Sequence, residues 1–259
     1  MAIGIIYFLV IVVANSLGAI SGMGGGVLIK PVLDLIGHDS VAAVSFYSSV
    51  AVLTMSIVAT CKQVCTGEKL KWQIIGWIAL GAAGGGLVGK NVLVLGLNYF
   101  PEKKVLAVQI IVTVVTILFA FLRTRFEWQS WTLSGVLWYL GCGLILGFFA
   151  SFLGIGGGPI NVALLMLMFN MPIKDATVYS ICIILFSQAA KVTGIVFAGE
   201  YAAIDLRMLW FIIPAGIVGG YVGSMLSHSF NATKVELVFQ SMLLIVVLVN
   251  VYNGITLFV

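Results

Sequence analysis

Charged residues are scarce in this chain. Only 8% of its 259 residues are charged, whereas 61% are hydrophobic, and the net charge at pH 7 is +4. A soluble domain averages about 25% charged residues, so a soluble protein of this composition could not cover its surface with polar groups. The composition therefore predicts an integral membrane protein. The lysines and arginines are scattered along the chain, which gives no indication of nucleic-acid binding.

Residues that usually carry catalysis or bind metals are also few. The four cysteines, Cys61, Cys65, Cys142 and Cys182, fit neither a disulfide framework nor a zinc site, and the two histidines form no cluster. The chain has no zinc-protease motif, no phosphate-binding loop and no nucleophile elbow. We therefore expect no enzyme activity, no metal and no cofactor. Any transport must then be driven by gradients or by a separate partner.

Long apolar segments dominate the chain. A membrane-spanning helix needs about 20 apolar residues. The segments that approach or exceed this length are Ile3–Ile20, Val41–Thr60, Trp72–Leu97, Lys104–Leu122, Trp131–Leu153, Ile173–Ala198, Leu206–Ser227 and Val235–Phe258. Two shorter segments, Val27–Ile36 and Pro159–Phe169, can cross only about half of the bilayer core. The prediction is an all-α polytopic membrane protein with eight long transmembrane helices and two short or re-entrant helices that follow glycine-rich interruptions.

The order of these segments repeats. Gly22–Gly26 aligns with Gly154–Gly158, and Tyr47-Ser48 aligns with Tyr179-Ser180 at the same offset along the chain. Two homologous repeats, residues 1–125 and 126–259, are the simplest explanation. Their relative orientation is left open, although the basic loop of the first half has a counterpart that is not basic, which favours inversion.

The glycine interruptions are the strongest functional signal. The first reads Gly18-x3-Gly22-x-Gly24-Gly25-Gly26-x4-Pro31, and each glycine in a helix interior costs about 1 kcal/mol relative to alanine. An unwound backbone can approach a ligand closely, and a helix that begins there presents free amides to an anion. Glycine-interrupted segments at matching positions of two halves point to a transporter site; tight helix packing is the alternative. We predict substrate binding at Gly22, Gly24, Gly25, Gly26, Gly154, Gly156, Gly157 and Gly158.

Buried charges are expected near these glycines. Lys30, Lys90 and Lys191 lie inside apolar segments, where a charge costs roughly 2.5–3.5 kcal/mol on insertion scales, so a role in anion binding is predicted for Lys30 and Lys191. Lys30 could instead pair with Asp34, Lys90 could reach an interface, and Lys191 has no obvious local partner. A proton-coupling role for Asp34 is a further hypothesis. Polar candidates that could bind substrate, or simply join helices, are Ser45, Ser48, Asn161, Tyr179, Ser180 and Gln188.

Other glycines recur at four-residue spacing and predict close helix packing. They belong to three sets, Gly81-x3-Gly85-x3-Gly89, Gly143-x3-Gly147 and Gly216-x3-Gly220. Small residues at this spacing let the backbones of membrane helices approach one another.

The paired motifs resemble those of the sulfite exporter TauE/SafE family of bacterial and archaeal permeases. The resemblance covers nearly the whole chain and rests on Gly18-x3-Gly22-x-Gly24-Gly25-Gly26-x4-Pro31, on Gly154-x-Gly156-Gly157-Gly158-Pro159 and on the polar stretch after each short helix. It implies a plasma-membrane secondary transporter that exports sulfite or small organosulfonates. Pro31 has Ala163 at its counterpart, so the two half-sites are not expected to be equivalent.

Two alternatives stay open. The same architecture could import another sulfur oxyanion such as thiosulfate, or the chain could be a non-transporting membrane assembly or scaffold protein. The expected partners are a small sulfur-containing oxyanion and the lipid bilayer, not nucleic acid, and a homodimer is left open.

Overall fold

Helix boundaries follow the predicted apolar segments closely. The computed structural model describes residues 2–66, 71–126 and 129–258, and the regular secondary structure of this part is helical throughout. Its α-helices are α1 (Ala2–Ser21), α2 (Gly26–Ile36), α3 (Val41–Cys65), α4 (Trp72–Tyr99), α5 (Glu102–Arg125), α6 (Val136–Phe152), α7 (Pro159–Phe169), α8 (Ile173–Phe197), α9 (Leu209–Ser229) and α10 (Ala232–Phe258). Two short 3-10 helices, η1 (Glu200–Ala203) and η2 (Leu206–Met208), connect α8 to α9.

One predicted long helix is shorter than expected. The segment predicted as Trp131–Leu153 is helical only from Val136, so α6 has 17 residues. Ahead of it, the chain is hydrogen-bonded to the last carbonyl groups of α7, and Gly135 has a φ of 122°, which a side chain would disfavour. Seven helices in the described chain are therefore long and apolar enough to cross a membrane, rather than eight, and α6 and α7 are shorter apolar helices.

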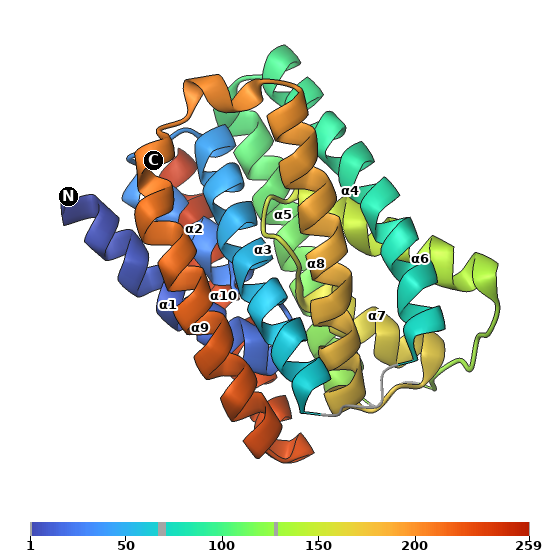
Figure 1. Cartoon of the computed structure of the whole chain (residues 1–259). Coiled ribbons are helices and arrows are strands. Elements are labelled where there is room, and N and C mark those ends of the chain that lie inside the picture. The colour runs from blue at the N-terminus through green and yellow to red at the C-terminus, as the bar shows by residue number, and fades with distance from the viewer. Residues whose placement is uncertain (1, 67–70, 127–128, 259) are drawn as a thin grey trace.

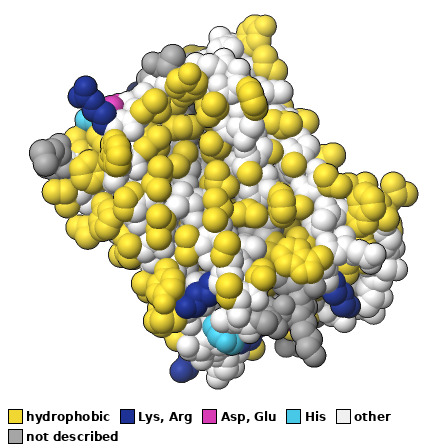
Figure 2. Space-filling view, viewed as in Figure 1, with side chains coloured by type: hydrophobic (Ala, Val, Ile, Leu, Met, Phe, Trp, Pro, Cys, Tyr) yellow, Lys and Arg dark blue, Asp and Glu magenta, His cyan; other side chains and the backbone are white. Residues whose placement is uncertain are grey.

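The outward faces of the long helices are apolar. Leu9, Ile111 and Leu244, from three different helices, are all well exposed. Figure 2 shows hydrophobic side chains over the middle of one face, with the charged side chains near its two ends. This distribution matches a bundle whose sides contact lipid and whose ends contact water.

α3 and α8 pack against each other at the centre of the bundle, with the α4–α6 pair on one flank and the α1–α9 pair on the other (Figure 1). In both flanking pairs the two helices pack closely at glycine positions, as predicted for α4 and α6. Added Cβ atoms would clash with carbonyl oxygens of the partner helix at Gly81, Gly85 and Gly89 of α4, at Gly143 and Gly147 of α6, and at Gly223 of α9. The Gly216–Gly220 stripe of α9 faces α3 instead. These glycines therefore serve helix packing.

The two halves of the chain run in opposite directions. Ser45, near the start of α3, contacts Lys191, near the end of α8, whereas Thr60, near the end of α3, lies beside Cys182. α3 and α8 are thus antiparallel, although they occupy corresponding places in the two predicted repeats. The orientation left open by the sequence is inverted. The homology of residues 1–125 and 126–259 stays a prediction.

The short helices turn back on the helices that precede them. The Tyr7 hydroxyl at the start of α1 donates a hydrogen bond to Asp39, just after α2, at 2.6 Å. Likewise, the amide of Trp131, ahead of α6, donates to the carbonyl of Leu167 near the end of α7. α2 and α7 are therefore re-entrant, and they return to opposite ends of the bundle.

The two ends of the bundle differ in charge. We call the end formed by the C-termini of α3 and α5 and the N-termini of α4 and α8 the basic end; it carries Lys62, Lys71, Arg125 and Lys174. The other end, here the acidic end, carries Asp39, Glu102, Glu200 and Asp205 together with a few basic residues.

Candidate functional site

The two glycine interruptions share one backbone conformation. Gly22 and Gly24 have φ angles of 71° and 78°, and their counterparts Gly154 and Gly156 both have 69°. Side chains disfavour this left-handed region. The chain can therefore leave α1 and α6 and turn into the short helices only because these positions are glycine.

The two breaks lie in direct contact at the centre of the bundle. A Cβ atom on Gly26 would clash with the carbonyl oxygen of Ile155, and one on Gly157 would approach the carbonyl oxygen of Met23. Val52 of α3 and Ile184 of α8 enclose the contact from either side. Backbone of one half therefore packs on backbone of the other half where both are unwound, an arrangement tolerated at membrane depth only when protein or a cavity surrounds it.

Both short helices begin without a capping side chain. The amides of Leu28 and Ile29 are bonded to the carbonyl of Gly25, but those of Gly26 and Val27 find no acceptor in the described part of the chain. The N-cap of α7 is Gly158, which also has no side chain to offer. Free amide groups, with the positive end of the helix dipole behind them, are therefore present at the start of α2. At α7 the first residue, Pro159, has no amide hydrogen, and the Asn161 amide donates to the carbonyl of Gly158, so fewer donors remain there.

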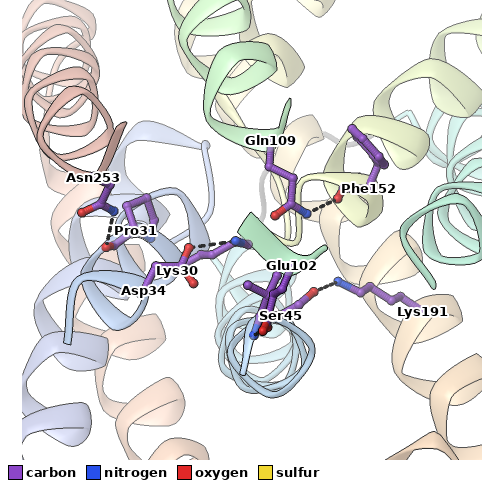
Figure 3. Close-up of polar contacts among 10 residues, drawn as sticks. Lys30, Pro31, Asp34, Ser45, Glu102, Gln109, Phe152, Lys191 and Asn253 are labelled. Carbon is purple, nitrogen blue, oxygen red and sulfur yellow. Dashed lines mark hydrogen bonds and ion pairs between the residues drawn. The ribbon is translucent and has the colours of Figure 1, made fainter. Parts of the chain in front are cut away.

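Two buried lysines approach the start of the second break (Figure 3). The ammonium of Lys30 lies 2.8 Å from Asp34, which confirms the local pairing considered from the sequence. Lys191 is 1% exposed and donates to the hydroxyl of Ser45 at 2.8 Å. In the described chain no carboxylate lies within ion-pair distance of Lys191. Lys191 is thus a buried lysine whose amino group has a neutral hydroxyl, not a carboxylate, as its partner in this part of the chain.

Gly154 brings the two lysines into one cluster. A Cβ atom on Gly154 would lie 2.6 Å from the Ser45 hydroxyl and 3.0 Å from Cε of Lys30. We call Lys30, Ser45, Gly154 and Lys191 the lysine cluster. At the offset that relates the two glycine motifs, the positions of Lys30 and Lys191 correspond to uncharged residues of the opposite half. The charge therefore gathers at one of the two breaks.

The other predicted site residues differ in whether their polar groups have a partner and in where they lie. Ser48 is fully buried beside Gly26, and its hydroxyl has no partner in the described chain. Its counterpart Ser180 donates to the carbonyl of Gly22, so it holds the first break in place. Asn161 and Gln188 are buried with unsatisfied amide oxygens, whereas the Tyr179 hydroxyl accepts a bond from the Lys71 amide at the basic end. Tyr179 therefore does not join the lysine cluster.

Several polar residues missed by the sequence reasoning anchor the site. The Asn15 amide donates to the carbonyl of Ala51 at 3.2 Å, and a Cβ atom on Gly25 would clash with the Asn15 side chain. Gln109 of α5 donates to the last residue of α6 at 2.7 Å. The short helices are held by the last helix of the opposite half, α7 by Arg123 and α2 by Asn253. Asn15, Gln109 and Asn253 are polar residues inside apolar segments, which is the signal that could have revealed them, whereas Arg123 directly follows the segment Lys104–Leu122.

Comparison with known proteins identifies the family. The family described as sulfite exporter TauE/SafE matches residues 7–250, nearly the whole chain. The chain belongs to this family. The probable membrane transporter protein YunE of Bacillus subtilis (strain 168) is 24% identical over 111 residues, which cover 43% of this chain and 40% of that protein. The match thus spans less than half of that relative. No solved structure matches. The chain is a multi-pass membrane protein of this family, as its composition and apolar helices predicted.

This TauE/SafE protein has a cavity at each end, and the one on the acidic side reaches the lysine cluster. A cavity of about 720 Å³ at the basic end is lined by residues of the α3–α4 loop and of α6 to α9, including Lys71, Tyr179 and His228. A much smaller cavity of about 50 Å³ lies on the acidic side of the lysine cluster and is lined by Ser45 and Lys191. The arrangement offers an anion a positive charge, hydroxyls and free amides inside a protein that is apolar on its outer face.

Proposed function

We propose that the protein is a secondary transporter that carries a small sulfur monoanion, hydrogen sulfite or an organosulfonate, across the plasma membrane. The observation that carries the proposal is Lys191, a buried cation whose hydrogen-bond partner is the neutral hydroxyl of Ser45. A charge buried in a membrane helix is costly unless something neutralises it, and such residues commonly mark substrate pathways. A bound anion would supply the missing counter-charge.

The net charge of the lysine cluster supports a monoanion. Lys30 is neutralised by Asp34 at 2.8 Å, so Lys191 contributes one uncompensated positive charge. A dianion such as sulfate would leave a negative charge buried, with the desolvation penalty that this entails. Hydrogen sulfite and sulfonates carry one charge on oxygens that accept hydrogen bonds. The hydroxyls of Ser45 and Ser48 are donors for these oxygens.

The charges at the two ends support export from the cytoplasm. Cytoplasmic loops of membrane proteins are enriched in lysine and arginine, so the basic end is assigned to the cytoplasm. The cavity of about 720 Å³ opens on this end, and substrate would load from there. Transport by motion of one half against the other is how many transporters with inverted halves work.

The test is anion flux into proteoliposomes that contain the purified protein. Sulfite and methanesulfonate, a sulfonate with a single charge, are compared with taurine, thiosulfate, sulfate and chloride, with and without a pH gradient. The Lys191→Met variant removes the buried charge, and Lys103→Gln, which removes an exposed lysine at the acidic end, is the matched control.

The proposal requires saturable flux of sulfite or methanesulfonate that Lys191→Met abolishes and Lys103→Gln leaves intact. Preferential thiosulfate flux would shift the assignment to another sulfur oxyanion. Absence of flux for every anion, from protein that is folded, would reject the transport of sulfur oxyanions and favour the scaffold alternative.

A further inference from the structure

A second buried lysine lies on the acidic side of the lysine cluster. The ammonium of Lys90, on α4, donates to the carbonyl of Gly194 at 3.2 Å and pairs with Glu200 at 2.8 Å. Gly194 stands three residues after Lys191 on α8, so Lys90 lies about one helical turn beyond Lys191 toward the acidic end. From the sequence, Lys90 could either have a functional role or simply reach an interface.

Lys90, Glu200, Lys191 and Ser45 line the same cavity of about 50 Å³. Most of its other walls are apolar side chains of α3, α4 and α8, such as Phe46 and Leu93. An anion that leaves Lys191 toward the acidic end therefore passes between apolar walls, and Lys90 is a cation on its way.

The two partners of the Lys90–Glu200 pair differ in their surroundings. The Lys90 side chain is 8% exposed, whereas that of Glu200 is 34% exposed. Glu200 begins η1, a four-residue 3-10 helix between α8 and α9, whereas Lys90 is fixed inside the long helix α4. Moving Glu200 outward hydrates its carboxylate and needs no rearrangement of a membrane helix. Lys90 cannot be left behind without an anion, because an unpaired buried charge is costly.

We infer that Lys90 is a second anion-binding station, that Glu200 occupies it when substrate is absent, and that the transported anion displaces Glu200 on its way to the acidic end. The inference rests on the proposed function and adds a site and a release step to it. When the anion departs, Glu200 returns to Lys90 and closes the cavity again. Glu200 thus acts as an intramolecular competitor, which lowers the apparent affinity of Lys90 for anions.

The experiment measures equilibrium binding of sulfite by calorimetry to purified, folded variants. The unmodified protein binds sulfite at the lysine cluster, and Lys191→Met removes that site. Because Glu200 still occupies Lys90, Lys191→Met should show no measurable binding. Adding Glu200→Gln should restore it, with an affinity within about tenfold of the unmodified protein, since the competitor is gone while Lys90 remains. A gain of binding cannot arise from misfolding.

Two controls assign the restored binding. Adding Lys90→Gln to the Lys191→Met/Glu200→Gln protein should abolish it, and replacing Glu200→Gln by Glu236→Gln, on α10 away from the cavity, should not restore it. The assignment of Lys90 as a second anion-binding station would be overturned if Lys191→Met/Glu200→Gln did not bind sulfite. It would also be overturned if the restored binding persisted after Lys90→Gln was added. If the unmodified protein itself binds no sulfite, the proposed function fails first, so the two failures are distinguishable.

Discussion

Replacing Lys191 by methionine should stabilise the transporter in the absence of anions and abolish its response to them. Methionine keeps an unbranched side chain in the buried position but removes the charge. A charge near the middle of a membrane helix costs roughly 2.5–3.5 kcal/mol, and the interhelical hydrogen bond to Ser45 offsets about 0.6 kcal/mol of this. The substitution should therefore raise the free energy of unfolding by about 2 kcal/mol.

Thermal unfolding of the detergent-solubilised protein measures both effects. A change of 1 kcal/mol shifts the Tm of a chain of this size by roughly 2–4 °C, so Lys191→Met should melt about 4–8 °C higher than the unmodified protein. Methanesulfonate at 100 times its Kd should stabilise the unmodified protein by about 2.7 kcal/mol. The same concentration should leave the Tm of Lys191→Met unchanged.

Lys30→Met is the matched contrast, because it removes the other lysine of the cluster. Lys30 is paired with Asp34, and both side chains are buried. Removing one partner of a buried pair leaves an uncompensated charge, which typically costs about 3–5 kcal/mol. The two lysine-to-methionine substitutions should therefore change the Tm in opposite directions. A Lys191→Met protein that melts below the unmodified protein and keeps its full methanesulfonate shift would refute the assignment of Lys191 as an unpaired anion ligand.

Two further pairs of variants test the packing and the central contact. Gly85→Leu should greatly reduce the yield of folded protein, because a Cβ atom there meets the Leu144 carbonyl of α6, whereas Gly84→Leu, with nothing within 4 Å of its Cβ position, should fold normally. Size-exclusion chromatography measures the yield of folded protein for each variant. Equal yields would contradict the close approach of α4 and α6. Ser180→Ala should lower the free energy of unfolding by about 1 kcal/mol, since it loses a hydrogen bond to the first break. Ser48→Ala removes a hydroxyl that has no partner in the described chain. This substitution should leave the free energy of unfolding within about 0.5 kcal/mol of the unmodified protein but weaken anion binding. Equal effects of the two serine substitutions on both measurements would count against an anion near Ser48.

The helices could be predicted from the sequence because their signals are local. A run of apolar residues, its length and the glycines that end it all lie within one segment, so the bounds of α2 and α7 were predicted to within one residue. The start of α6 could not be predicted in this way. The predicted segment began at Trp131, but the amides of Trp131 and Leu133 are hydrogen-bonded to the end of α7 and Gly135 has a φ of 122°, so the helix begins at Val136.

In the candidate site, too, the local features could be predicted from the sequence and the contacts between distant segments could not. The left-handed turns at Gly22 and Gly154 require glycine, so they are visible as glycine in the sequence. The pairing of Lys30 with Asp34 follows from their spacing of one helical turn. The partner of Lys191 could not be predicted in this way, because Ser45 lies in the other half of the chain and contacts Lys191 only when α3 and α8 pack antiparallel.

The structure separates what the two halves share from what distinguishes them. Both breaks have the same turn conformation and face each other at the centre, which a device that opens alternately to two sides needs. The lysines do not follow this pattern, since Lys30 and Lys191 both gather at Gly154 and Lys90 lies beyond them toward the acidic end. A symmetric scaffold holding an asymmetric row of charges would bind its anion at one break and release it past Lys90. On this reasoning the glycines determine that the protein can transport, and the placement of the lysines determines what it binds and the path by which it leaves.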